Sequence, residues 1–69
     1  MILSAVIFKD QDMYVAECLE VRTLSQGYTI EEALSNLKKA TELYLEEFPL
    51  EKHFNPLFTT FEVTLNPKN

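Results

Sequence analysis

One long amphipathic stretch, SQGYTIEEALSNLKKATELYLEE at residues 25–47, constrains the fold more than any other part of the sequence. At about 100° per residue, its apolar side chains fall within one arc of roughly 140°, and most charged side chains fall on the opposite side. This pattern predicts a helix with one face for burial. The helix is expected to end after about five turns, because Pro49 disfavours helical backbone at the preceding residue. The apolar arc consists of Ile30, Ala33, Leu34, Leu37, Ala40, Thr41, Tyr44, Leu45 and Phe48.

The start of this helix carries a separate signal. Thr29 is a favourable N-cap residue, and Glu32 stands three positions later, where its side chain can reach back to the Thr29 amide. Gly27 is the one glycine of the sequence and stands where the chain turns into the helix, a place where a positive φ angle is often required. Together with Ser25 and Gln26, these residues predict how the helix begins.

Three segments before the helix are predicted to be β-strands. Residues 2–8 (ILSAVIF) are almost continuously apolar, which suits a strand covered on both faces. The polar cluster KDQD at residues 9–12 has a turn-forming composition and predicts a hairpin to residues 13–18 (MYVAEC). Residues 22–26 predict a third strand. Side chains alternate along a strand, so the second strand should place on one face Tyr14, Ala16 and Cys18.

A fourth strand is predicted after the helix. Residues 58–65 (FTTFEVTL) alternate, with Phe61, Val63 and Leu65 on one side and mainly polar residues on the other, which is typical of a half-buried strand. The sequence thus predicts an α+β fold of order β-β-β-α-β, in which one amphipathic helix packs across one face of an antiparallel sheet. We expect residues 1–69 to form a single domain, since the sequence has no internal repeat or low-complexity tract.

The size of the chain predicts self-association. A domain below about 70–80 residues seldom builds a sufficient core alone, and one cysteine and one histidine, Cys18 and His53, supply neither an internal disulfide nor a structural zinc site. A single helix covers one face of the sheet, whereas the first strand is apolar on both faces. We therefore expect a homodimer, or a tetramer of paired dimers, and the candidate contact residues are Ile2, Val6 and Phe8.

Charge and hydropathy narrow the possible partners. Eleven acidic and six basic residues give a net charge of −5, which disfavours binding to nucleic acid and favours a basic partner. No segment has the pattern of a signal peptide or is long and apolar enough to cross a bilayer. We expect a soluble, cytoplasmic protein with no membrane contact.

The sequence gives little support to a catalytic role. One glycine excludes a glycine-rich phosphate loop, and residues 2–8 contain no acid with which to begin a two-metal carboxylate site. Cys18 and His53 could be considered as nucleophile and base, but Cys18 is expected to face the helix and nothing brings His53 near it. We expect a binding protein that is not an enzyme and carries no cofactor or metal.

Residues 13–21 (MYVAECLEV) and 24–47 resemble the N-terminal domain of HicB-like antitoxins, a partly degenerate RNase H-like fold. The family pattern has an extended Y-x-A-x-x-P segment, a short loop, then S-Q-G-x-T-x-x-E-A-x-x-N, and a helix ending in an L-Y-L-like turn. Two departures stand out. First, the loop at residues 19–21 is shorter than in many relatives. Second, the sequence ends at Asn69, where fuller relatives continue into a DNA-binding domain. Operator binding is therefore not carried over, and we expect an intact short protein. The matching residues are Tyr14, Ala16, Ser25, Gln26, Gly27, Thr29, Glu32, Ala33, Asn36, Tyr44 and Leu45.

The resemblance implies a type II antitoxin that binds and masks a small basic mRNA interferase of the HicA type. An acidic surface would meet a basic, RNA-facing one. A second hypothesis stays open, namely a stand-alone dimerisation or adaptor module of the same fold whose partner is not a toxin. Ordinary solvated acids would look the same in the sequence as the candidate toxin contacts, which are Asp10, Asp12, Glu17 and Glu20.

Overall fold

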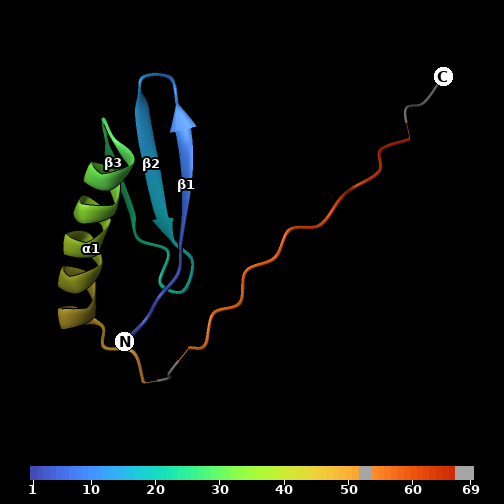
Figure 1. The fold of residues 1–69 in the computed structure, drawn as a ribbon. Coiled ribbons are helices and arrows are strands. Elements are labelled where there is room, and N and C mark those ends of the chain that lie inside the picture. Colours follow the sequence, from blue (N-terminus) through green and yellow to red (C-terminus); the bar gives the residue numbers. More distant parts are fainter. Residues whose placement is uncertain (52–53, 67–69) are drawn as a thin grey trace.

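A computed structural model of the chain describes residues 1–51 and 54–66, and His53 lies outside the described residues. Three strands are followed by one helix: β1 (Ala5–Asp10), β2 (Met13–Cys18), β3 (Leu24–Gly27) and α1 (Ile30–Glu47). The strands form one antiparallel sheet in the order β1-β2-β3, and α1 lies on one side of it (Figure 1). This confirms the predicted α+β class and the single helix packed across one face of the sheet.

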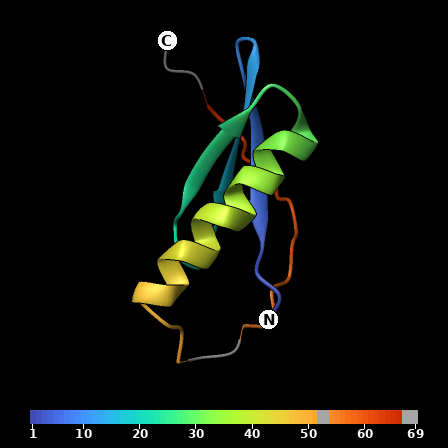
Figure 2. The same ribbon diagram turned by 90° about the vertical axis from the view of Figure 1, so that its left-hand side faces the viewer.

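The strand register decides which side chains meet the helix. Ala5 lies opposite Cys18 and Ile7 lies opposite Ala16, and these pairs are on the face that α1 covers. The predicted inner face of β2 is therefore confirmed. Figure 2 shows α1 running diagonally across the strands, so that its two ends lie over different parts of the sheet.

The buried core is small and consists of side chains of modest size. Ala16 and Cys18 from β2 meet Ala33 and Leu37 from α1, with further packing from residues that are only partly buried. Farther along α1, the Oγ1 atoms of Thr41 and Thr23 lie 2.7 Å apart and hydrogen bond. The partly buried apolar residues around the core are Leu3, Ala5, Ile7, Tyr14 and Val21.

The predicted apolar arc of the helix is only partly buried. Ala33, Leu37 and Thr41 are buried, whereas Ile30, Leu34 and Tyr44 each keep about two fifths of their surface exposed. Three narrow strands in a single chain cannot cover an arc this wide. The helix therefore carries more apolar surface than its own sheet can bury.

Both boundaries of the first and of the third strand differ from the prediction. The first strand ends at Asp10 rather than at residue 8, because Lys9 and Asp10 of the predicted turn pair with Tyr14 and Met13, and the third ends at Gly27 rather than at residue 26. The first strand begins at Ala5 rather than at residue 2, because the Ser4 amide donates to the Glu20 carboxylate rather than to the backbone of a neighbouring strand. The third begins at Leu24 rather than at residue 22. Arg22 has a left-handed backbone (φ 67°) and its N–H donates to the Cys18 carbonyl at 2.8 Å, which makes a turn there.

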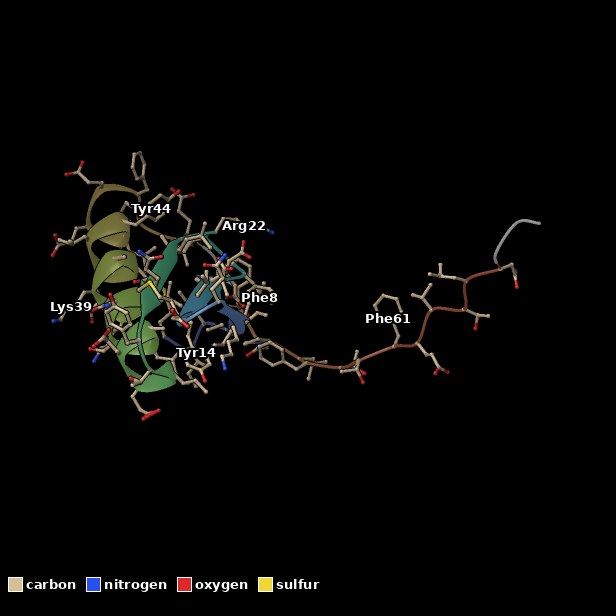
Figure 3. All side chains as sticks on the ribbon, turned by 90° about the horizontal axis from the view of Figure 1, so that it is seen from above. Phe8, Tyr14, Arg22, Lys39, Tyr44 and Phe61 are labelled. Atoms are coloured by element: carbon tan, nitrogen blue, oxygen red, sulfur yellow. The ribbon has the colours of Figure 1, made fainter. Side chains whose placement is uncertain are left out.

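The strand predicted at residues 58–65 is not formed in the described chain, so the observed order is β-β-β-α. The segment is extended but runs away from the sheet, and Phe61 and Leu65 are 86% and 83% exposed (Figures 1 and 3). A strand needs a neighbour to pair its N–H and C=O groups. The alternation of residue types predicts an extended segment with one apolar side, but it does not specify the strand with which that segment pairs.

The turn between β1 and β2 offers a test of local backbone strain. Gln11 has a left-handed backbone with φ 57°, a conformation that disfavours residues with a Cβ atom. We expect Gln11→Gly to raise the free energy of unfolding by about 0.5–1 kcal/mol, measured by urea denaturation. The neighbouring Asp12 does not have a positive φ angle, so Asp12→Gly should lower stability instead. Equal changes in the two variants would contradict this explanation.

Candidate functional site

The start of α1 is closed by two reciprocal hydrogen bonds. Thr29 Oγ1 accepts from the Glu32 amide at 3.0 Å, which confirms Thr29 as the N-cap. The Glu32 carboxylate reaches back as predicted, but it accepts from the Tyr28 amide at 2.8 Å rather than from the Thr29 amide. The backbone amide that donates to the Glu32 carboxylate thus lies one residue earlier than in the capping-box pattern. Both bonds serve the helix start and need no ligand.

Gly27 is required for close packing and not for a positive φ angle, which corrects the prediction. Its φ angle is not positive. A Cβ atom at this position would lie 2.6 Å from the backbone N of Ala33 and 2.9 Å from the carbonyl carbon of Glu32. The last residue of β3 therefore touches the first turn of α1 backbone to backbone, and glycine is the one residue type small enough for that approach.

The remaining residues of the predicted helix start also have structural roles. Ser25 and Gln26 lie in β3, opposite Ala16 and Val15 of β2. The side-chain amide of Asn36 donates to the Gln26 carbonyl at 2.8 Å, which ties the second turn of α1 to the edge of β3. This group holds the helix on the sheet.

The four predicted acidic contacts do not form one cluster. Asp10 ends β1 and Asp12 lies in the following turn, and both are exposed. Glu17 and Glu20 lie at the other end of β2, about 13 Å away along the strand at 3.3 Å per residue. The structure therefore separates them into an exposed pair at the turn and a pair with partners inside the chain.

Glu17 lies on the face of the sheet that α1 leaves uncovered. Its carboxylate is 2.8 Å from Arg22 Nη2, and this is the one ion pair within residues 1–51 and 54–66. The Glu17 side chain is half-buried, whereas that of Arg22 is largely exposed. Because the Arg22 side chain is 73% exposed, this pair contributes little to stability, and Arg22 can be displaced from Glu17, whose own side chain is 17% exposed.

Glu20 binds the segment that precedes β1. Its carboxylate accepts from the Ser4 amide at 2.8 Å and from Ser4 Oγ at 2.6 Å, and Cys18 Sγ lies 3.6 Å away as a weaker donor. Desolvation acts to raise the pKa of the Glu20 carboxyl, but the two hydrogen bonds from Ser4, with smaller contributions from its own amide and from Cys18, outweigh it and lower the pKa below its ordinary value. The charge of Glu20 is therefore used within the fold.

The open face of the sheet has an apolar centre. By register, Phe8 lies opposite Val15, and Glu17 lies between Val6 and Leu24. Phe8 is 52% exposed and Leu24 is 61% exposed, whereas Val6 and Val15 are half-buried. Figure 3 shows Phe8 and Lys39, on the outer surface of α1, on opposite sides of the molecule. This surface, comprising Val6, Phe8, Val15, Glu17 and Leu24, is called the open face below.

The predicted self-association residues are all at least partly accessible. Val6 and Phe8 lie on the open face, and Ile2 precedes β1 and is mostly exposed. Their accessibility is compatible with a contact between copies, and that contact stays a prediction.

A groove between α1 and the segment that leads into β1 is a feature that the sequence did not reveal. It has a volume of about 380 Å³, and its walls are mainly apolar. The groove could have been expected from the width of the apolar arc on the helix, because this arc is wider than a sheet of three short strands can cover. Its apolar lining residues include Leu3, Ala5, Leu34, Leu37 and Leu45.

Among residues 1–51 and 54–66, no three side chains of His, Cys, Asp or Glu come together in a way that could hold a metal ion. In the same part of the chain, no helix combines the length and the apolar character needed to cross a bilayer.

Comparison with known proteins gives one informative relative. Over 46 residues the chain is 48% identical to a UPF0150 protein of Helicobacter pylori, a match that covers 65% of this chain and 64% of the relative. The match thus spans less than two thirds of the relative's own length. No family model matches the chain, and no solved structure matches it.

Proposed function

We propose that this chain is a HicB-like antitoxin-type protein that binds and neutralises a small basic mRNA interferase of the HicA type. The UPF0150 family is the HicB-like family, so the relative from Helicobacter pylori supports the proposal at family level. The observation that carries it is the open face, an apolar surface with carboxylates at and beside it. Binding, with no catalytic step, cofactor or nucleic-acid contact in this chain, is the proposed activity.

The open face has the composition of a protein-binding surface. Interfaces concentrate their binding energy in a few large, central apolar side chains, surrounded by a polar rim. Phe8 and Leu24 are large apolar residues that keep more than half their surface exposed. A basic partner would cover them while its cations approach the carboxylates of Asp10 and Glu17.

The acidic residues divide by role in this proposal. Asp10 and Asp12 are exposed at the turn, where they can attract a basic surface and raise the rate of association. Glu17 can exchange its Arg22 partner for a cation of the toxin. Glu20 acts as a positioning residue, because it holds Ser4 and the start of β1 in place.

The test is co-expression with the neighbouring reading frame, which the proposal requires to encode a small basic protein, followed by co-purification and an RNA cleavage assay. We expect a complex of fixed ratio in which cleavage is suppressed. Phe8→Ser should raise the dissociation constant at least tenfold, because it removes the central apolar contact. Leu43 is 64% exposed on α1, away from the open face, so Leu43→Ser is the matched control and should bind as wild type does.

Two outcomes would contradict the proposal. Equal weakening by Phe8→Ser and Leu43→Ser would show that the open face is not the contact. Recovery of this chain only with itself, even at low salt, would favour the second hypothesis, a stand-alone dimerisation or adaptor module. The mass of Phe8→Ser without partner separates a lost partner contact from a lost contact between copies.

A further inference from the structure

The outer edge of β1 and the groove beside it form one unsatisfied surface. Within the described residues β1 pairs only with β2, so its other edge presents unpaired backbone N–H and C=O groups. The groove lies at the start of β1, with Leu3 and Ala5 on the strand side and Leu34 and Leu37 on the helix side. A strand added here would be hydrogen bonded by β1 and would have an apolar wall beneath it.

The C-terminal segment, residues 58–65, has the features of that missing strand. It is already extended, and its apolar side chains Phe61, Val63 and Leu65 alternate with Thr60, Glu62 and Thr64. Eight residues of strand span about 26 Å at 3.3 Å per residue, enough to cover β1 (Ala5–Asp10) and the groove residues just before it. Every residue of the segment is exposed in the single chain.

We propose that residues 58–65 of one copy add as a strand to the free edge of β1 in a second copy, and that the second copy does the same in return. Phe61, Val63 and Leu65 then cover the groove of the partner copy. Thr60, Glu62 and Thr64 point to the other side of the enlarged sheet. The open face gains a further carboxylate, that of Glu62, and stays accessible to another partner.

Several observations favour a second copy as the source of the strand. The segment leads away from its own sheet rather than across its own groove (Figures 1 and 3). The radius of gyration of the Cα atoms is 15.2 Å, whereas a compact chain of this length is expected near 11 Å. Exchange of an identical segment closes after two copies and buries both exposed segments at once. Addition of a strand to an exposed sheet edge is a common binding mode.

The first test is the mass of the full-length protein in solution by light scattering after size exclusion. Twice the chain mass of 8.0 kDa, or 16 kDa, is expected. Val63→Asp should weaken dimerisation at least tenfold, because it places a charge over the apolar groove. Thr64→Asp is the matched control, since threonine and valine have nearly the same size and Thr64 faces the other side. It should leave the dimer intact.

A second measurement keeps the proposal testable even if Val63→Asp unfolds. Wild-type copies carrying different isotope labels are mixed, and contacts between chains are detected by isotope-filtered NMR. Methyl groups of Val63 and Leu65 should contact those of Leu3, Leu34 or Leu37 in the other copy. A monomeric wild type, the same contacts found only within one chain, or equal effects of the two aspartate variants would overturn the proposal. None of these results depends on whether a toxin binds the open face.

Discussion

Replacing Gly27 with alanine is expected to lower the free energy of unfolding by about 3 kcal/mol. The added Cβ atom would meet the backbone N of Ala33 at 2.6 Å and the carbonyl carbon of Glu32 at 2.9 Å. Backbone atoms in the first turn of α1 cannot rotate aside as a side chain can. The helix would have to shift off β3, and such a loss is a large share of the roughly 5–15 kcal/mol that stabilises a typical domain.

Urea denaturation followed by circular dichroism measures this loss. The matched control is Gln26→Ala, since Gln26 is the exposed neighbour of Gly27 in β3 and its backbone carbonyl still accepts from Asn36. The control should stay within about 0.5 kcal/mol of wild type. If Gly27→Ala were equally mild, the backbone contact between β3 and α1 would not be what requires glycine.

The second large effect is expected for Glu20→Gln, with a loss of about 2 kcal/mol at neutral pH. Glutamine has one acceptor oxygen where the carboxylate has two, so the Ser4 amide and the Ser4 hydroxyl can no longer both donate, and the hydroxyl has to turn and accept from the glutamine NH2 group. Both bonds also lose the assistance of the charge. The segment before β1 should then be held less firmly to the loop after β2.

The pH dependence of this effect has a definite sign. The pKa of Glu20 is lower in the folded chain than in the unfolded chain, since the hydrogen bonds from Ser4 outweigh desolvation. The stabilisation is therefore present above the unfolded pKa and is lost as the pH falls through the folded pKa. Unfolding curves of wild type and Glu20→Gln should converge as the pH falls below the ordinary glutamate pKa of about 4.3. Glu51 lies at an exposed position, so Glu51→Gln should be as stable as wild type both at neutral pH and at low pH.

The sequence predicted those parts of the fold whose signals are local. Thr29 caps α1 and Pro49 follows its last turn, so the helix bounds depend on residues within the helix or beside it. The alternation in β2 predicted its inner face for the same reason. Residues 58–65 also carry a clear alternation, but strand pairing is a contact between distant segments or between copies, and a local pattern does not name the partner.

The sequence predicted which types of residue the candidate site contains, but not how they are arranged. Acidic residues were visible in the sequence, but nothing distinguished Glu20, which Ser4 binds, from Asp12, which is exposed. Gly27 stood out as a single glycine, whereas the reason for it, contact with the backbone of Ala33, exists only once α1 lies on β3. The open face and the groove follow from the way one helix covers a narrow sheet. Neither is encoded in a motif.

The buried thiol of Cys18 can report how often the helix separates from the sheet. Its thiol lies in the core between β2 and α1, only 2% exposed, and it is the one cysteine of the chain. A thiol-specific reagent reaches it only during moments when the helix lifts from the sheet. The rate of thiol modification therefore measures how often α1 separates from the sheet in the unaltered protein. Binding of a partner or a second copy that stabilises the contact between α1 and the sheet would lower this rate.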